Sequence, residues 1–201
     1  MIKLTTAEMN RLSVEAYREA DKLPLTVVLD NVRSQHNVGA VFRTADAMRI
    51  REVVLCGICC CPPNAEIHKT ALGAEESVEW RYFHDTIEAV HALRQAGYRV
   101  YAVEQAHDSV TLEAFVESLT AEGDPTASAV LQRSGLTAEG DHNGIAVVFG
   151  HEVFGVQQEV VDLCDGCIEI PQYGTKHSLN VSVTAGIVLY RISEALRKLT
   201  V

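Results

Sequence analysis

Short, nearly continuous apolar runs recur along the chain and predict strands that are buried on both faces. The first run covers residues 23–29 (LPLTVVL), whose β-branched residues favour a strand. Runs of the same kind follow at residues 52–56, 99–103, 145–149 and 167–170. Strands that are apolar on both faces are typical of parallel sheets. Residues 78–83 alternate instead, which predicts an edge strand.

Helical spacing appears between these runs, at residues 38–48, 65–72, 85–95 and 156–163. A long final helix is predicted from about residue 179 to 199, with one apolar stripe made by Val181, Ala185, Val188, Ile192, Ala195 and Leu199. Thr5 and Glu8 have capping-box spacing and precede apolar Met9 and Leu12, which predicts a leading helix. The alternation of strands and helices predicts an α/β fold: a parallel sheet with helices on both faces and a ligand pocket at the carboxyl ends of its strands.

The composition fits one compact domain. The chain has 201 residues, of which 47% are hydrophobic and 22% are charged. We expect a main domain at residues 23–201, preceded by an N-terminal helical extension at residues 1–22. No apolar run reaches the roughly 18 residues that span a bilayer, and the N-terminus is polar. We therefore expect no membrane partner, a cytoplasmic location and reduced thiols for the six cysteines.

Charge is distributed unevenly along the chain. Seventeen Lys and Arg against 27 Asp and Glu give a net charge of −10, which argues against broad, nonspecific binding of nucleic acid. Residues 102–143 alone carry −7, so the rest of the chain leaves room for a local basic surface. Residues 123–144 are rich in small and polar residues. They predict a mobile acidic connection at about 120–144.

Polar residues follow the first strand directly, in the segment LDNVRSQHNVGAVFRTADAM at residues 29–48. Asn37 lies at the expected start of a helix, and Arg43 lies on its first turns. A helix N-terminus favours phosphate, and an arginine nearby can bind it with two hydrogen bonds. An ordinary strand-to-helix turn capped by Asn37, with a surface arginine, is an equally good interpretation of this loop alone.

Two further segments share this position at a strand end. In VVFGHEVFG, Glu152 lies between Gly150 and Gly155, which permit a close backbone approach, and its carboxylate needs a donor. Taken alone, this loop could equally be a structural turn. In IPQYGTKHSLNVSVTAG, Ser178 is a natural N-cap, and Asn180 enters the final helix. Capping and local backbone bonding are the alternative role for Asn180. The residues alone thus predict a strand-end pocket with amides, hydroxyls, an arginine and a glutamate.

Taken together, NVGAVFRTA, FGHEVFG and IPQYGTKHSLNVSV resemble the three signature motifs of the SpoU (TrmH-like) family of the SPOUT RNA methyltransferases. The resemblance covers about residues 23–199 and includes KTALGAEESV. It implies a parallel α/β sheet with a C-terminal deep trefoil knot. It also implies methyl transfer from S-adenosyl-L-methionine to a ribose 2'-hydroxyl in tRNA or rRNA, by a homodimer that builds its active site across the interface. RNA, and not DNA, is the expected partner.

The resemblance also implies roles for individual residues. The methyl donor would be held by backbone groups at Gly150, Ile170 and Leu179. The catalytic and RNA-facing side chains would be Asn37, Arg43, Glu152, Ser178 and Asn180. Arg43 either fixes a phosphate and stabilises alkoxide charge, which we favour because a guanidinium keeps its proton, or acts as the base. We expect further RNA contacts at Arg33, Arg49, Lys69 and Lys176.

Other functions are weighed against this one. An RNA-binding protein on the same fold without activity is the main alternative, although Asn37, Arg43 and Asn180 are intact. A nucleotide-dependent dehydrogenase is disfavoured because no GxGxxG follows the first strand. Two CxxC pairs, Cys56 with Cys59 and Cys164 with Cys167, have zinc-ligand spacing but lie far apart in sequence. We expect no metal.

Overall fold

The structure is a computed structural model that describes residues 1–5, 8–120 and 144–199. Most of the expected mobile acidic connection, at residues 121–143, lies outside the described residues.

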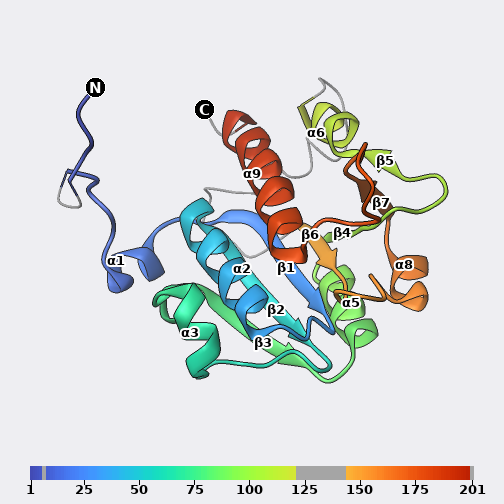
Figure 1. The fold of residues 1–201 in the computed structure, drawn as a ribbon, viewed down its shortest axis with the longest axis horizontal. Coiled ribbons are helices and arrows are strands. Elements are labelled where there is room, and N and C mark those ends of the chain that lie inside the picture. Colours follow the sequence, from blue (N-terminus) through green and yellow to red (C-terminus); the bar gives the residue numbers. More distant parts are fainter. Residues whose placement is uncertain (6–7, 121–143, 200–201) are drawn as a thin grey trace.

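The described residues form a parallel sheet of seven strands in the order β3-β2-β1-β6-β4-β7-β5 (Figure 1). The strands are β1 (Leu23–Asp30), β2 (Ile50–Cys56), β3 (Glu79–Phe83), β4 (Arg99–Val103), β5 (Val110–Thr111), β6 (Ile145–Phe149) and β7 (Gly166–Glu169). All eight residues of β1 are buried, as expected for a central strand of a parallel sheet. The alternating run forms β3 at one edge, as predicted. The short strand β5, at the other edge, is not predicted by the sequence pattern.

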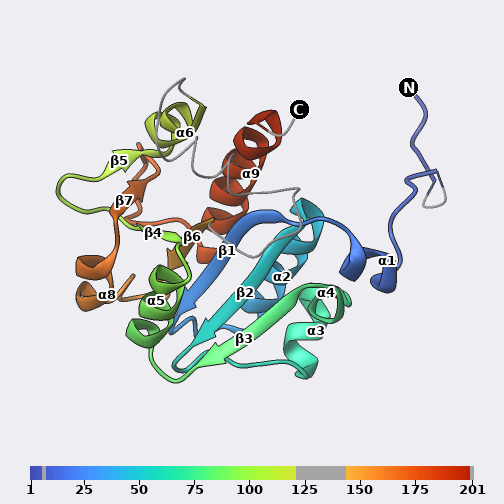
Figure 2. The ribbon, with the colours of Figure 1, turned by 180° about the vertical axis from the view of Figure 1, so that it is seen from behind.

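Helices cover both faces of the sheet (Figure 2), which confirms the predicted layers. One face carries α2 (Gln35–Met48), α3 (Ala65–Ala71), α6 (Leu112–Thr120) and α9 (Val181–Leu199), and the other carries α5 (Thr86–Gln95) and α8 (Gln158–Leu163). Along β1, Val27 and Leu29 contribute to the core under α2 and α9, whereas Val28 contributes to the core under α5 and α8. None of the described helices is long and apolar enough to cross a membrane.

Two contacts join α2 and α9 at corresponding ends. At their N-terminal ends, Asn180 Nδ2 donates to Asn37 Oδ1 at 3.2 Å. At their C-terminal ends, the Arg197 guanidinium donates to the Met48 carbonyl at 2.8 Å. The two helices therefore run in the same direction. The N-termini of both helices lie at the side of the sheet formed by the carboxyl ends of the strands.

The leading helix differs from the prediction. Thr5 and Glu8 form the predicted capping-box bonds, with Glu8 Oε2 accepting from the Thr5 backbone at 2.7 Å. The helix, however, is α1 (Val14–Glu19), and its N-cap is Ser13. Met9 and Leu12 are 44% and 51% exposed. A short helix needs an apolar surface to pack against, and the exposed Met9 and Leu12 provide no such packing.

Two helix starts also differ from the predictions. The sequence suggests Asn37 as a cap for a helix at residues 38–48, but α2 begins three residues earlier, at Gln35, and Ser34 is its N-cap. The prediction that Ser178 caps the final helix is wrong: Asn180 Oδ1 accepts from the Ser182 amide at 2.9 Å, and α9 begins at Val181. The short helix α4 (Ala74–Ser77) and α6 are not predicted by the sequence pattern.

Candidate active site

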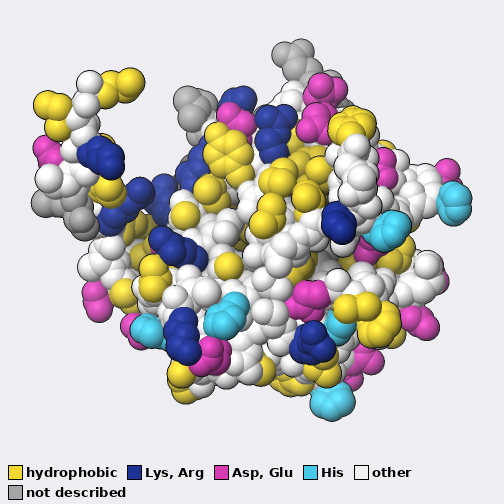
Figure 3. Space-filling model, viewed as in Figure 1, with side chains coloured by type: hydrophobic (Ala, Val, Ile, Leu, Met, Phe, Trp, Pro, Cys, Tyr) yellow, Lys and Arg dark blue, Asp and Glu magenta, His cyan; other side chains and the backbone are white. Residues whose placement is uncertain are grey.

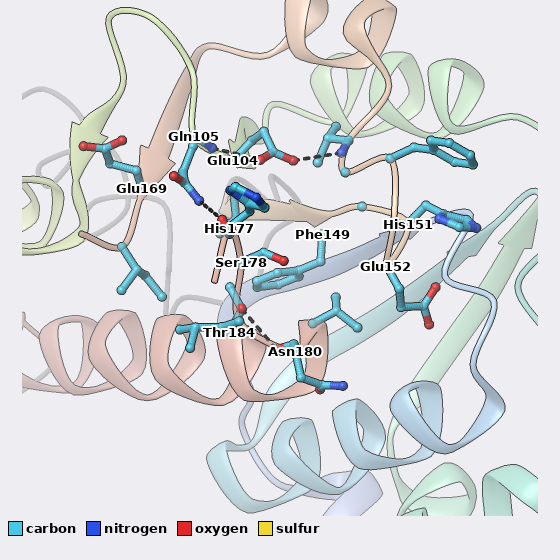
Figure 4. A pocket seen from close by; sticks show the side chains of 18 of the residues that line it. Glu104, Gln105, Phe149, His151, Glu152, Glu169, His177, Ser178, Asn180 and Thr184 are labelled. Carbon is cyan, nitrogen blue, oxygen red and sulfur yellow. Dashed lines mark hydrogen bonds between the residues drawn. The ribbon is translucent and has the colours of Figure 1, made fainter. Parts of the chain in front are cut away.

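A cavity of about 630 Å³ lies at the carboxyl ends of β4, β6 and β7 (Figure 4). Residues after β4 and β6 line one part of it. The lining residues from β7, the loop after it and the start of α9 are Ile168, Glu169, Ile170, Gln172, His177, Ser178, Leu179, Asn180, Val181 and Thr184. This is the sheet edge at which the sequence predicts a ligand pocket. Six of the predicted site residues line the cavity: Gly150, Glu152, Ile170, Ser178, Leu179 and Asn180.

A small hairpin at residues 151–155 forms one wall of the cavity. The His151 amide donates to the Gly155 carbonyl at 3.0 Å, and the Gly155 amide donates to the His151 carbonyl at 2.8 Å. A Cβ atom at Gly150 would lie 2.0 Å from the backbone of Gly155, so only glycine fits there. Gly155 itself has a φ of 68°. The two glycines are thus required by the close approach that the sequence predicts.

Glu152 fixes this hairpin to the start of α2. Its carboxylate accepts from the Ser34 amide at 2.8 Å, the Arg33 amide at 3.1 Å and Asn37 Nδ2 at 3.0 Å. Burial of the Glu152 carboxyl raises its pKa, but these hydrogen bonds outweigh that effect and hold the pKa below the ordinary value of 4.5. Glu152 is therefore an anionic anchor that orients Asn37.

Asn180 extends this network to the third motif. Its side-chain amide donates to Asn37 Oδ1, and its own Oδ1 accepts from the Ser182 hydroxyl at 2.6 Å. In Figure 4 Asn180 lies at the start of α9, on the same side of the cavity as Glu152. The three motif segments, distant in sequence, are thus connected side chain to side chain through Asn37.

Glu104 and Gln105 also line the cavity and are missed as site residues by the sequence analysis. Glu104 Oε2 accepts from the Val156 amide at 3.1 Å, and Gln105 Nε2 donates to the His177 carbonyl at 2.8 Å (Figure 4). Both residues directly follow a predicted strand, at residues 99–103. Their position at a strand end is the signal that identifies them.

Asp30 is a third strand-end residue that the sequence analysis misses. It ends β1, is fully buried, and accepts from the Thr86 hydroxyl at 2.6 Å. The Gln157 backbone and side chain donate to the same carboxylate at 2.9 and 2.8 Å. Asp30 therefore holds the start of α5 and the segment before α8 at the edge of the sheet that carries the cavity.

The predicted basic residues do not gather at one place. Arg33 is exposed beside Glu152, and Lys176 is exposed in the loop that reaches the cavity. Lys69 pairs with Glu66 at 2.6 Å on α3. Arg49 is the C-cap of α2, at the end away from the cavity. Arg43 is exposed on α2 and is not among the residues that line the cavity.

The thiols of both CxxC pairs lie in packed surroundings. Burial raises the pKa of Cys56, Cys59 and Cys164 to about 12. The Cys59 thiol donates to the Leu29 carbonyl at 3.3 Å, and the Cys167 thiol donates to the Glu104 carbonyl at 3.3 Å. Metal binding needs the thiolate, which these surroundings disfavour.

The fold and the cavity define a class of parallel α/β protein whose ligand pocket lies at the carboxyl ends of the strands. Three loop segments, which Asn37 links to one another, form this site. The chain belongs to the SpoU rRNA methylase family, whose model matches residues 24–190. This confirms the family indicated by the three motifs.

Two curated relatives illustrate the similarity. The tRNA (guanosine(18)-2'-O)-methyltransferase of Thermus thermophilus is 31% identical over 183 residues, which cover 91% of this chain and 81% of that protein. The 23S rRNA (guanosine-2'-O-)-methyltransferase of Vibrio parahaemolyticus is 28% identical over 193 residues, which cover 95% of this chain and 66% of that protein.

Solved structures share the fold. The TrmH/SpoU tRNA modifying enzyme of A. aeolicus superposes with a TM-score of 0.70 at 24% identity, covering 92% of this chain and 83% of that one. The AdoMet-bound rRNA methyltransferase of Sinorhizobium meliloti superposes with a TM-score of 0.68 at 23% identity, covering 89% of this chain and 59% of that one.

Proposed function

We propose that this protein transfers the methyl group of S-adenosyl-L-methionine to a ribose 2'-hydroxyl of tRNA or rRNA. The observation that carries the proposal is the network of Glu152, Asn37 and Asn180 beside a strand-end cavity, in a chain of the SpoU family. Two relatives are named for 2'-O-methylation of guanosine, one in tRNA and one in 23S rRNA.

The cavity suits the methyl donor. Its volume of about 630 Å³ falls within the range of small-molecule sites. Backbone groups at Gly150, Ile170 and Leu179 are available to hold the donor, and the lining residues Glu104 and Glu169 carry carboxylates, whose charge complements a cation. When bound, the donor supplies an already electrophilic methyl group, so the protein's task is to align and activate the ribose oxygen.

The side chains around the cavity divide this task. Glu152 orients Asn37, and Asn180 is held against Asn37 while it caps α9. Arg43 fixes the phosphate beside the target ribose and stabilises negative charge that develops on the 2'-oxygen, because a guanidinium keeps its proton. Ser178 lines the cavity and shapes the ribose and donor pockets.

A homodimer is part of this proposal. Val183, Ile187 and Tyr190 lie at i, i+4 and i+7 on α9 and are 51%, 38% and 52% exposed. Figure 3 shows hydrophobic side chains gathered over this helix. An exposed apolar stripe on a helix is typical of a protein interface. Arg43 is exposed on the neighbouring α2 rather than in its own cavity, so we place it in the site of the second subunit.

The C-terminal trefoil knot also belongs to the proposal. After β6 the chain passes to the α5 face as α8, returns as β7 between β4 and β5, and reaches the opposite face as α9. Gln105, just after β4, contacts His177 in the last loop, which supports threading of that loop past the segment after β4. A crystal structure whose last loop runs outside that segment would contradict the knot.

The function is tested by incubating the protein with labelled S-adenosyl-L-methionine and RNA from a strain that lacks it. We expect label in tRNA or rRNA and one phosphodiester bond that resists alkaline hydrolysis, because the methylated 2'-oxygen can no longer attack its neighbouring phosphate. RNA binding without any transfer of label would support the alternative, an inactive RNA-binding protein on the same fold.

A further inference from the structure

We propose that Phe154 is a stacking platform for the base of the RNA nucleotide that is methylated, and that Arg33 holds a phosphate beside it. The inference rests on the proposed function and adds how the substrate is held. Phe154 lines the cavity, yet it is 83% exposed. A large apolar ring that is left in solvent at the mouth of a ligand cavity has contact surface available for a partner.

The backbone presents this ring in a fixed position. Phe154 lies in the 151–155 hairpin, which two backbone hydrogen bonds close. The Val153 amide donates to His151 Nδ1 at 3.0 Å, and Glu152 fixes the hairpin to the start of α2. A ring on a rigid support loses little conformational entropy when a ligand stacks on it.

Two neighbouring side chains favour a nucleotide as the occupant. The His151 ring lies 5.0 Å from the Phe154 ring, centroid to centroid, at an interplanar angle of 33°. The exposed Arg33 lies next to Glu152 of the same hairpin, because its backbone amide donates to that carboxylate at 3.1 Å. An aromatic platform beside an arginine is the usual combination for an unpaired nucleotide, with the base stacked and the phosphate paired.

The test measures single-turnover methyl transfer at subsaturating RNA, using the RNA from the strain that lacks the protein. Phe154→Ala should lower the rate about 5- to 150-fold, which is the range for loss of one stacked base. Phe154→Tyr should keep the rate, because it keeps the ring. Tyr82→Ala is the control, since it removes a partly exposed ring on the edge strand β3, which does not line the cavity. Donor affinity, measured by calorimetry, should be equal in all variants.

The salt dependence of RNA binding separates the two parts of the proposal. Arg33→Ala should reduce the slope of binding against salt by about one phosphate, and Phe154→Ala should leave the slope unchanged. A rate for Phe154→Ala equal to that of the wild type overturns the platform and leaves the proposed function intact. Loss of donor affinity in Phe154→Ala would instead assign the ring to the donor. If the wild type transfers no label to any RNA, the proposed function itself fails.

Discussion

The Asn180 side-chain amide donates to Asn37 Oδ1 at 3.2 Å across 143 residues of sequence. Asn37 in turn donates to Glu152, so one amide joins the other two motif segments. Each side chain in this network hydrogen-bonds to the next, which makes the network rigid and leaves the Asn37 side chain little rotational freedom. The three side chains therefore act together, and substitutions of single residues can test the role of each.

Arg43 should act across the proposed dimer interface. Arg43→Ala alone should lower the transfer rate at least about a hundredfold with donor affinity unchanged, and Arg43→Lys should rescue little because lysine lacks the planar fork. Arg81→Ala, on the exposed edge strand β3, is the control.

Mixing two inactive variants tests the arrangement. Arg43→Ala and Asn180→Ala chains, mixed in equal amounts, should recover about a quarter of the wild-type activity, because half of the dimers are mixed and each mixed dimer holds one complete site. Recovery of no activity, with subunit exchange verified, would place Arg43 in its own subunit's site.

Asn180 should have two separable roles. Asn180→Ala should lower the free energy of unfolding by about 1 kcal/mol, since it removes the N-cap of α9. Asn180→Ser should restore that stability, because serine also caps, but not the activity, because it cannot replace the amide that reaches Asn37. Ser178→Ala should leave stability unchanged. Urea unfolding and transfer assays measure both properties, and a large loss of stability in Ser178→Ala would restore Ser178 as the cap.

Glu152 should stabilise the fold only while it is ionised. Its pKa is lower in the folded state than the ordinary value of 4.5, so its contribution is present above that value and is lost as the pH falls through the folded pKa. Glu152→Gln should therefore be less stable than the wild type at neutral pH, with the difference closing in acid. Urea unfolding of both proteins at neutral and at acidic pH measures the stability difference, with Glu117→Gln on the exposed surface of α6 as control. A difference that does not change with pH would contradict the anchor.

The α9 stripe should hold the dimer together. Ile187→Asp and Tyr190→Asp should give monomers by light scattering at micromolar concentration, with loss of methyl transfer, because a buried unpaired carboxylate is costly at an apolar interface. Val110→Asp, at an apolar position of similar exposure on β5, should remain dimeric. A wild-type protein that is monomeric and fully active would overturn this prediction.

Donor binding should not depend on metal. Chelation should leave the affinity for the donor unchanged, and so should Cys164→Ser with Cys167→Ser, because neither the sulfonium chemistry nor the thiols' packed, protonated state calls for an ion. Calorimetry with the donor measures affinity, and circular dichroism verifies folding. Loss of donor binding by a folded variant would support a zinc site.

The strands could be predicted because their signal is local. A run such as 23–29 is apolar on both faces wherever it occurs, and β1 is buried along its whole length. The alternating run that becomes β3 likewise identifies an edge. The order of the strands depends on contacts between distant segments, and it could not be read from periodicity.

Helix starts were harder to predict because polar residues compete for the same cap. Ser34 and Asn37 both suit the start of α2, and the choice depends on Glu152, which takes the Asn37 amide from 115 residues away. Ser178 and Asn180 compete in the same way. Glu104 carried a usable strand-end signal, but in the sequence it also belongs to an acidic stretch, which suggests only repulsion of phosphate.

The separation of the three motifs along the sequence also determines at which point of translation the site can form. Asn37 and Glu152 leave the ribosome before Asn180, which completes the network and starts the helix that packs along α2. A chain released between Glu152 and Asn180 has most of the sheet but no complete site. Chains left unfinished at that stage therefore lack Asn180, and with it the third member of the network on which the proposed methyl transfer depends.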